Sequence, residues 1–247
     1  MKQSRKIAKY LLIAAFYIAG WAAVSLLVGQ ELLLPTPWAT LRRFLSLLIQ
    51  AESWRLAGMT LARVMAGYVL GILCGVLLAV ACASFPFAGA LLAPLKSVIK
   101  ATPVTSFILL ALLWLSSGIV PLFIAFLMVL PIVWTNTLEG ILHTDPLLLE
   151  MGKAFRIGRA RTLREVYVPS VLPQFLAACT TSLGFAWKSG VAAEIIALPK
   201  HSIGYQLYQS KLNIETLDLF AWTLLVILLS MLIESLLVKL LGRIRHD

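Results

Sequence analysis

From Ala101 to Leu138 the chain reads ATPVTSFILLALLWLSSGIVPLFIAFLMVLPIVWTNTL, and none of these 38 residues is charged. As a single helix the stretch would be about 57 Å long, nearly twice the thickness of a bilayer core. Near its midpoint stand Ser-Ser-Gly at 116–118 and then Pro121, which are residue types typical of a turn. The stretch therefore predicts a tight hairpin of two membrane spans, over residues 101–116 and 120–137.

The composition of the whole chain indicates a membrane protein. Of its 247 residues 60% are hydrophobic and 13% are charged, and the mean hydropathy is +0.92. Soluble domains carry about 25% charged residues, and a globule with so few charges would expose enough apolar surface to aggregate in water. The composition therefore excludes a soluble enzyme or binding module. The net charge of +10 fits the cytoplasmic loops of a membrane protein, and we expect the lipid bilayer, and no nucleic acid, as a partner.

Four further runs are long and apolar enough to cross a bilayer core, which takes about 20 residues. They cover residues 10–29, 60–83, 168–188 and 217–240. Pro86 ends the second run, because proline breaks a helix interior, and we expect a short cytoplasmic connection with Lys96 and Lys100 after it. The predicted fold class is an all-α polytopic membrane protein with about six transmembrane helices, folded as a single domain over residues 1–247.

Basic residues set the expected orientation, because cytoplasmic loops are rich in lysine and arginine. Four basic residues precede the first span, and five lie between Lys153 and Arg164 in the loop 139–166. We therefore expect both termini and this loop on the cytoplasmic side of the membrane. A cleaved signal peptide is the alternative for the N-terminal run, but 10–29 is longer than the apolar part of such a signal, about 7–15 residues.

Two stretches outside the spans are expected on the side of the membrane opposite the cytoplasm. Thr36 and Pro37 suit the cap and the first turn of a helix, and the apolar residues from Trp38 onward recur on one face. This spacing predicts an amphipathic helix, either at the outer interface or packed between the first two spans. Residues 189–215 are rich in small and polar types, which suits a gate or a docking surface.

The loop 139–166 predicts two short helices joined at a glycine. Asp145 suits an N-cap and Pro146 a first turn. Apolar residues then recur at helical spacing until Gly158 interrupts them, and a basic second helix runs into the span that opens at Pro169. A soluble partner that grips this elbow could push on the spans. The alternative is an ordinary basic loop that only satisfies the preference for positive charge inside.

In these residues the chain resembles the permease subunits of ABC importers. Their cytoplasmic signature reads Glu-Ala-Ala, then three residues and a glycine, then nine residues and Ile-x-Leu-Pro. Glu150 fits the acidic position, Met151 and Gly152 replace the two alanines, and Pro169 closes the signature 19 residues after Glu150. The glycine position holds Arg156, and a glycine follows two residues later.

The resemblance extends over nearly the whole chain and is nearest to the sulfonate, taurine and nitrate branch of these permeases. Further matching segments are 34–37, 60–68, 101–103 and 186–194, with Gly204-Tyr205 after them. The resemblance implies a type I importer fold like that of methionine importers, and a homodimer in the inner membrane. It also implies two cytoplasmic P-loop ATPases that bind ATP and Mg, and an external substrate-binding protein. The residues that it implies for coupling to the ATPase are Glu150, Met151, Gly152, Ala154, Phe155, Gly158, Leu163 and Pro169.

The implied function is that of a permease subunit that forms a translocation pathway for a small solute, such as a sulfonate, a nitrate-like anion or a vitamin precursor. The chain has no G-x-x-x-x-G-K-[ST] sequence, so we expect no cofactor in it and no enzymatic activity of its own. Its three histidines are scattered over separate loops, so we also expect no metal site. The alternatives are a secondary transporter, which commonly has internal repeats and intramembrane carboxylates, and a membrane scaffold that transports nothing.

Polar residues inside spans usually face a cavity or the interior of a bundle. Each of them can instead bond its own helix backbone or a neighbouring span. The candidates for the pathway are Thr102, Ser106, Asn136 and Thr181, together with Glu194, which the resemblance places near an outer gate.

Overall fold

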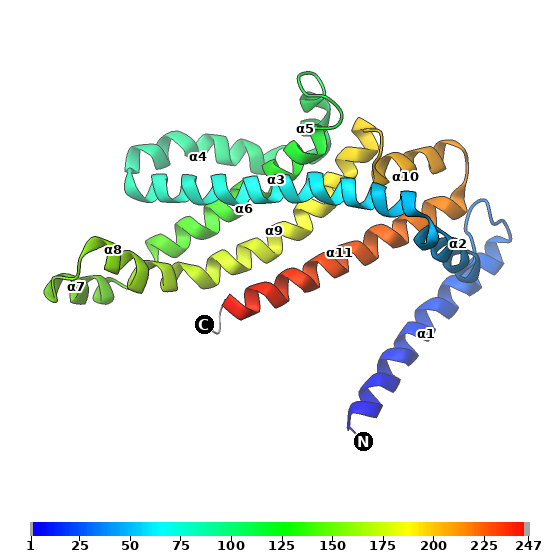
Figure 1. Ribbon diagram of the computed structural model, residues 1–247, viewed down its shortest axis with the longest axis horizontal. Coiled ribbons are helices and arrows are strands. Elements are labelled where there is room, and N and C mark those ends of the chain that lie inside the picture. The colour runs from blue at the N-terminus through cyan, green and yellow to red at the C-terminus, as the bar shows by residue number, and fades with distance from the viewer. Residues whose placement is uncertain (1, 245–247) are drawn as a thin grey trace.

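The computed structural model describes residues 2–244, and all regular secondary structure in this part of the chain is helical (Figure 1). The all-α fold class is therefore confirmed. In chain order the elements are α1 (Lys2–Val28), α2 (Pro37–Ile49), α3 (Ala51–Ser84), α4 (Pro86–Ala101), α5 (Val104–Ala111), α6 (Val120–Leu142), α7 (Pro146–Ala154), α8 (Arg159–Thr162), the π-helical turn η1 (Leu163–Tyr167), α9 (Val168–Ala197), α10 (Ile203–Leu212) and α11 (Thr216–Ile244).

Four stretches of helix in the described part are long and apolar enough to cross a membrane. Three are α3, α6 and α11, and the fourth is α9 together with α8 and η1, which run into it without a break. The apolar part of α1, Leu12–Val28, is a shorter candidate. Each of these helices covers one of the apolar runs seen in the sequence, but most are longer than the run. The 34 residues of α3, for example, begin at Ala51 where the sequence predicted a span from residue 60.

The expected span over residues 101–116 is wrong. These residues form only α5, a helix of 8 residues, followed by turns. The chain returns along α3 in α4 instead, a helix of 16 residues that starts directly after α3 (Figure 1). Lys96 and Lys100 therefore lie within a helix and not in a short cytoplasmic connection. The sequence prediction took the two charged residues as the sign of a loop, whereas they lie inside α4. Pro103 separates α4 from α5, because a proline disfavours helix at the residue before it.

Glycines bring α3 and α6 into close contact. Gly67, Gly71 and Gly75 are spaced four residues apart on the α3 face that packs on α6. A Cβ atom on Gly67 would lie 2.2 Å from the Leu122 carbonyl oxygen, and one on Gly71 would lie 2.6 Å from the Val129 Cβ. Small residues at this spacing let membrane helices approach closely and gain packing contacts. The α3–α6 pair is thereby fixed as the centre of the bundle.

The other helices pack around this centre. Helix α2 has the expected Thr36 cap, whose side chain accepts from the Ala39 N–H, and it lies against α11. There the Arg43 guanidinium binds both carboxylate oxygens of Asp218, at 2.5 and 2.6 Å. This hydrogen bond with Asp218 raises the pKa of Arg43. Helix α1 leans away from the bundle (Figure 1) and is held at its end by the Trp21 indole, which donates to the Pro35 carbonyl.

Candidate functional site

Helix α7 forms the first arm of the elbow that was expected in the loop 139–166. The Asp145 side chain accepts from the Leu147 N–H at 2.9 Å, as an N-cap, and Pro146 occupies the first turn. This helix lies at one end of the molecule, and its largest apolar side chains are exposed. The side chains of Leu147 and Phe155 are 72% and 75% exposed, and Met151 is 51% exposed. An exposed apolar row of this kind is typical of a surface that contacts another protein or the membrane.

The bend of the elbow lies at Arg156 and not at Gly158. Arg156 has a φ of +52°, in the left-handed region that favours glycine. The Ile157 N–H donates to the Gly152 carbonyl at 2.9 Å, which is the hydrogen bond of a Schellman motif at the end of a helix. Gly158 has a φ of −64°, which any residue adopts, and serves as the N-cap of α8. The expectation that Gly158 supplies the break is therefore corrected.

The second arm of the elbow is continuous with a membrane helix. Residues of α8 and η1 lead directly into α9, so that Arg159–Ala197 forms one stretch of helix. Pro169 lies in the first turn of α9 and has no N–H to donate to the preceding turn. A helix that meets this obstacle can widen locally, and η1 is such a π-helical turn. The elbow is therefore connected to the bundle by one continuous helical stretch.

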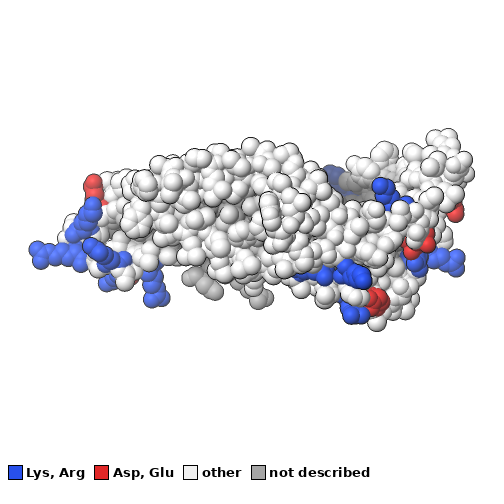
Figure 2. Space-filling model, turned by 90° about the horizontal axis from the view of Figure 1, so that it is seen from above, with Lys and Arg blue, Asp and Glu red and all other residues white. Residues whose placement is uncertain are grey.

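Positive charge surrounds the elbow. Figure 2 shows basic side chains gathered at the end of the molecule formed by α7 and α8, while the middle of the visible face carries no charge. All five basic residues of this end are exposed, and one of them, Arg161, pairs with Glu165 at 2.9 Å. The surface of the elbow thus combines exposed apolar side chains with a rim of basic ones. The five basic residues are Lys153, Arg156, Arg159, Arg161 and Arg164.

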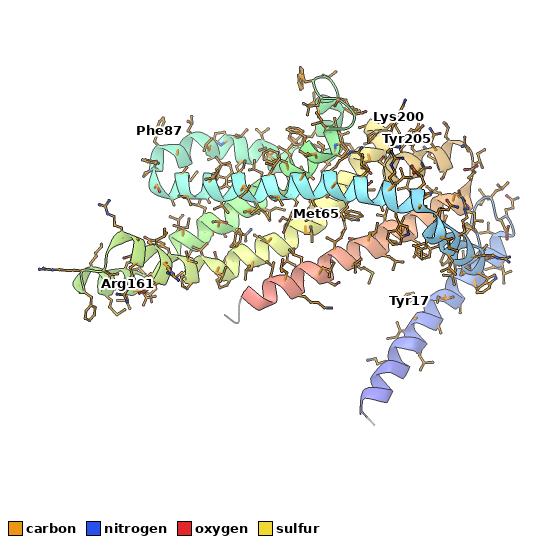
Figure 3. All side chains as sticks on the ribbon, in the orientation of Figure 1. Tyr17, Met65, Phe87, Arg161, Lys200 and Tyr205 are labelled. Carbon is orange, nitrogen blue, oxygen red and sulfur yellow. The ribbon has the colours of Figure 1, made fainter. Side chains whose placement is uncertain are left out.

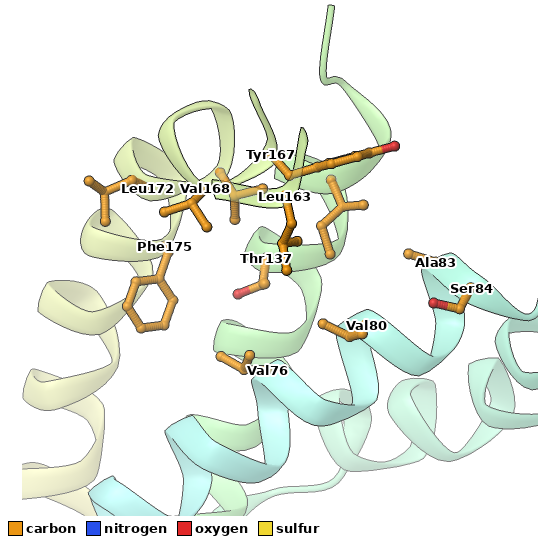
Figure 4. Close-up of a pocket in the computed structure, with 12 residues that line it drawn as sticks. Val76, Val80, Ala83, Ser84, Thr137, Leu163, Tyr167, Val168, Leu172 and Phe175 are labelled. Atoms are coloured by element: carbon orange, nitrogen blue, oxygen red, sulfur yellow. The ribbon is translucent and has the colours of Figure 1, made fainter. Parts of the chain in front are cut away.

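A cavity of about 650 Å³ lies where the elbow joins the bundle (Figure 4). Its walls come from α3, α6, η1 and the start of α9, and they are largely apolar. Leu163, one of the residues expected to couple to the ATPase, forms part of the wall beside Tyr167. Thr137 of α6 also lines the cavity, and its hydroxyl is buried with no hydrogen-bond partner in the described part of the chain.

The residues expected along a translocation pathway do not form one cluster within a single chain. Thr102 ends α4 and donates to the Val98 carbonyl, and Asn136 of α6 donates to the Ile132 carbonyl, so both bond their own helix backbone. Ser106 on α5 and Thr181 on α9 are exposed. The role of these residues in a pathway stays a prediction.

Glu194 is fully buried at the end of α9, and its carboxylate joins three helices. It accepts from the Thr60 hydroxyl at 2.9 Å and from the Arg63 guanidinium at 3.2 Å, both on α3. It also accepts from the Gly204 N–H of α10 at 3.2 Å, and a Cβ on Gly204 would lie 2.3 Å from the Glu194 Cβ. These bonds give both oxygens partners and tie α9 to α3 and α10.

The sequence reasoning did not identify the partners of Glu194. Arg63 is 131 residues away along the chain, and it also donates to the His201 carbonyl at 3.2 Å. One signal was present, because Arg63 and Glu194 are opposite charges at the outer ends of otherwise apolar runs. Charges in such places usually pair with one another.

Comparisons with known proteins agree with this geometry. A permease of Bacillus subtilis named for aliphatic sulfonates transport, SsuC, is 27% identical over 95% of this chain and 85% of its own length. The taurine transport system permease protein TauC of Escherichia coli is 22% identical over 90% of this chain and 82% of its own. A crystal structure of an amino acid ABC transporter superposes with a TM-score of 0.63 and 17% identity, and covers 83% of this chain and 96% of that one.

The solved structure supports the fold, and the two named permeases support the sulfonate and taurine branch that the sequence resembles. The family described as the inner membrane component of binding-protein-dependent transport systems matches residues 67–246, which is most of the chain. The chain is therefore a multi-pass inner membrane protein and belongs to this family of ABC importer permeases.

Proposed function

We propose that the chain couples solute import to ATP hydrolysis by a separate P-loop ATPase that docks on α7 and α8. Two copies would form the translocation pathway, two ATPases would bind ATP and Mg, and an external binding protein would deliver the solute. The solute is a small molecule such as a sulfonate, a nitrate-like anion or a vitamin precursor. The relatives named for sulfonate and taurine transport support this range.

The observation that carries the proposal is the construction of the elbow. One arm presents exposed Leu147, Met151 and Phe155, which would fill a groove on a partner. The other arm is continuous with α9. A partner that closes on ATP would therefore pull α8, η1 and α9 as one rigid unit. Rigid-body motion of this kind is how subunits convert a local event into a large rearrangement.

A pull-down from native membranes in mild detergent tests the proposal. Leu147→Asp or Phe155→Asp puts a charge into the apolar contact and should remove a P-loop ATPase from the purified complex, identified by mass spectrometry. Leu212→Asp is the matched control, because Leu212 is a similarly exposed leucine, at 62%, on α10 at the other end of the molecule. The ATPase should remain with wild type and with the control. An ATPase that stays with all three variants, or is absent from wild type, would contradict docking on the elbow.

A further inference from the structure

Two lysines of α4 lie beside the membrane-crossing helices, because α4 packs against α3 and α6. The turn between α3 and α4 lies toward the same end as the elbow; Phe87 and Arg161 mark that end in Figure 3, and Lys200 and Tyr205 lie toward the other. From Pro86 at this turn, Lys96 is about 15 Å along the helix and Lys100 about 21 Å, at 1.5 Å per residue. A bilayer core is about 30 Å thick. With the turn at the edge of the bilayer core, Lys96 would lie near the middle of the core.

Charges at this depth need a partner or a water-filled space. Among the residues that the structure describes, neither lysine has a carboxylate within ion-pair distance. The Lys96 ammonium lies over the ring of Trp134 on α6, 5.2 Å from its centroid, and a cation–π contact is favourable where water is excluded. Lys100 is exposed in the single chain. Both ammonium groups keep capacity for an anion.

The two lysines point away from the face of α4 that suits lipid. The large exposed apolar side chains of this helix are Phe87, Leu91, Leu95 and Val98, and they share one face. With about 100° of rotation per residue, Lys96 lies about 140° and Lys100 about 180° around the helix from Leu91. Membrane lysines almost always face a bundle interior or an aqueous cavity. This side of α4 therefore faces protein or water in the assembled transporter.

The break after α4 adds to the polarity of this region. Thr102 and Pro103 separate α4 from α5 one turn beyond Lys100, and no side chain caps the start of α5. Broken membrane helices near the midplane are a recurring feature of solute sites in transporters, where the free N–H groups of a half-helix favour negative charge. The break therefore adds positive potential to that of the lysines.

We propose that Lys96 and Lys100 form an anion-selecting step within the translocation pathway, which favours solutes with a small anionic group such as a sulfonate. The proposal rests on the proposed function, because it needs a pathway on this side of α4. It assigns selectivity to the permease itself, in addition to that of an external binding protein. Lys100 receives the anionic group, and Lys96, held over Trp134, attracts it toward the middle of the bilayer.

Cysteine labelling tests the site without knowledge of the solute. In the full chain in membrane vesicles, with Cys74, Cys82 and Cys179 replaced by alanine, Lys100→Cys is reacted with a sulfonate-bearing and a trimethylammonium-bearing methanethiosulfonate. The anionic reagent should react at least tenfold faster, and Lys96→Gln should abolish this preference. Val98→Cys, on the lipid face of the same helix, is the matched control and should not react. Absence of labelling at position 100, or faster labelling by the cation, would overturn the proposal.

Transport by the complete complex then separates this proposal from the proposed function. Lys96→Gln and Lys100→Gln should each lower ATP-dependent uptake of ethanesulfonate at least tenfold. Lys96→Arg and Lys100→Arg, which keep the positive charge, and the control Val98→Gln should retain wild-type uptake. If both glutamine variants take up ethanesulfonate at the wild-type rate, the lysine site is overturned while the proposed importer function stands. If wild type takes up no solute and no ATPase copurifies, the proposed function fails, and the labelling result still decides whether the lysines face an anion-accepting space.

Discussion

Arg156 stands at the glycine position of the family signature and has a positive φ. The signature has a glycine where this chain has Arg156, and the φ of +52° there is the conformation that glycine adopts without strain. The hydrogen bond from the Ile157 N–H to the Gly152 carbonyl holds the turn in place. Sequence comparison finds a departure from the pattern, and the structure shows that Arg156 adopts a φ that favours glycine.

Replacing Arg156 with glycine should make the bend of the elbow more stable. A non-glycine residue in the left-handed region costs about 1 kcal/mol, which corresponds to about a fivefold change in a population. Hydrogen exchange of the Ile157 amide should therefore slow by about that factor in Arg156→Gly. Arg159→Gly is the control, because Arg159 has helical backbone geometry in α8. Glycine destabilises a helix, so amide exchange in α8 should become faster in this variant. Faster exchange in Arg156→Gly would show that the positive φ is not a source of strain.

Removing Glu194 should strongly destabilise the outer end of the bundle. Glu194→Ala would leave Arg63, whose side chain is only 16% exposed, without its buried partner, and breaking a buried pair from one side costs about 3–5 kcal/mol. Glu165→Ala, which removes a pair whose side chains are 70% and 51% exposed, should cost less than about 1 kcal/mol. Thermal unfolding in detergent measures the loss of stability in each of the two variants. Equal midpoints for the two variants would contradict the structural role of Glu194.

At the scale of elements, two glycines of α3 give a matched test of helix packing. Gly71→Ala would place a Cβ 2.6 Å from the Val129 Cβ of α6, whereas a Cβ on Gly58 would meet nothing within 4 Å. Alanine favours a helix by about 1 kcal/mol over glycine, so Gly58→Ala should raise the unfolding midpoint. Gly71→Ala should lower it, because α3 and α6 must separate. A stabilised Gly71→Ala variant would contradict the close α3–α6 contact.

The sequence predicted most helices of the fold, because long apolar runs have few other structures available in a membrane. It failed at 101–116, where absence of charge was taken as the sign of a span. The structure places a helix earlier, at Pro86–Ala101 (α4), with Lys96 and Lys100 inside it. Charge alone therefore misplaced the helix, because lysines are compatible with a helix and uncharged residues also form turns.

The whole molecule shows which parts of a site can be predicted from one sequence. The elbow is local, since Glu150 and Pro169 are 19 residues apart, and its motif was visible along the chain. Its exact bend was not, because the left-handed conformation of Arg156 leaves no mark in the residue type. The Arg63–Glu194 pair joins residues 131 positions apart and depends on how α3 meets α9. The polar residues expected in the pathway lie on α5, α6 and α9 and at the end of α4, so one sequence cannot show how they are arranged.

The central claim, that the elbow docks a P-loop ATPase, is tested most directly by photo-crosslinking in native membranes. A photoreactive amino acid at position 155, where Phe155 is 75% exposed, should crosslink to a P-loop ATPase. The same amino acid at position 212, on α10 at the other end of the molecule, should not. An ATPase crosslinked from position 155 alone is the result that the account predicts. No ATPase from position 155, or equal crosslinking from both positions, would contradict it.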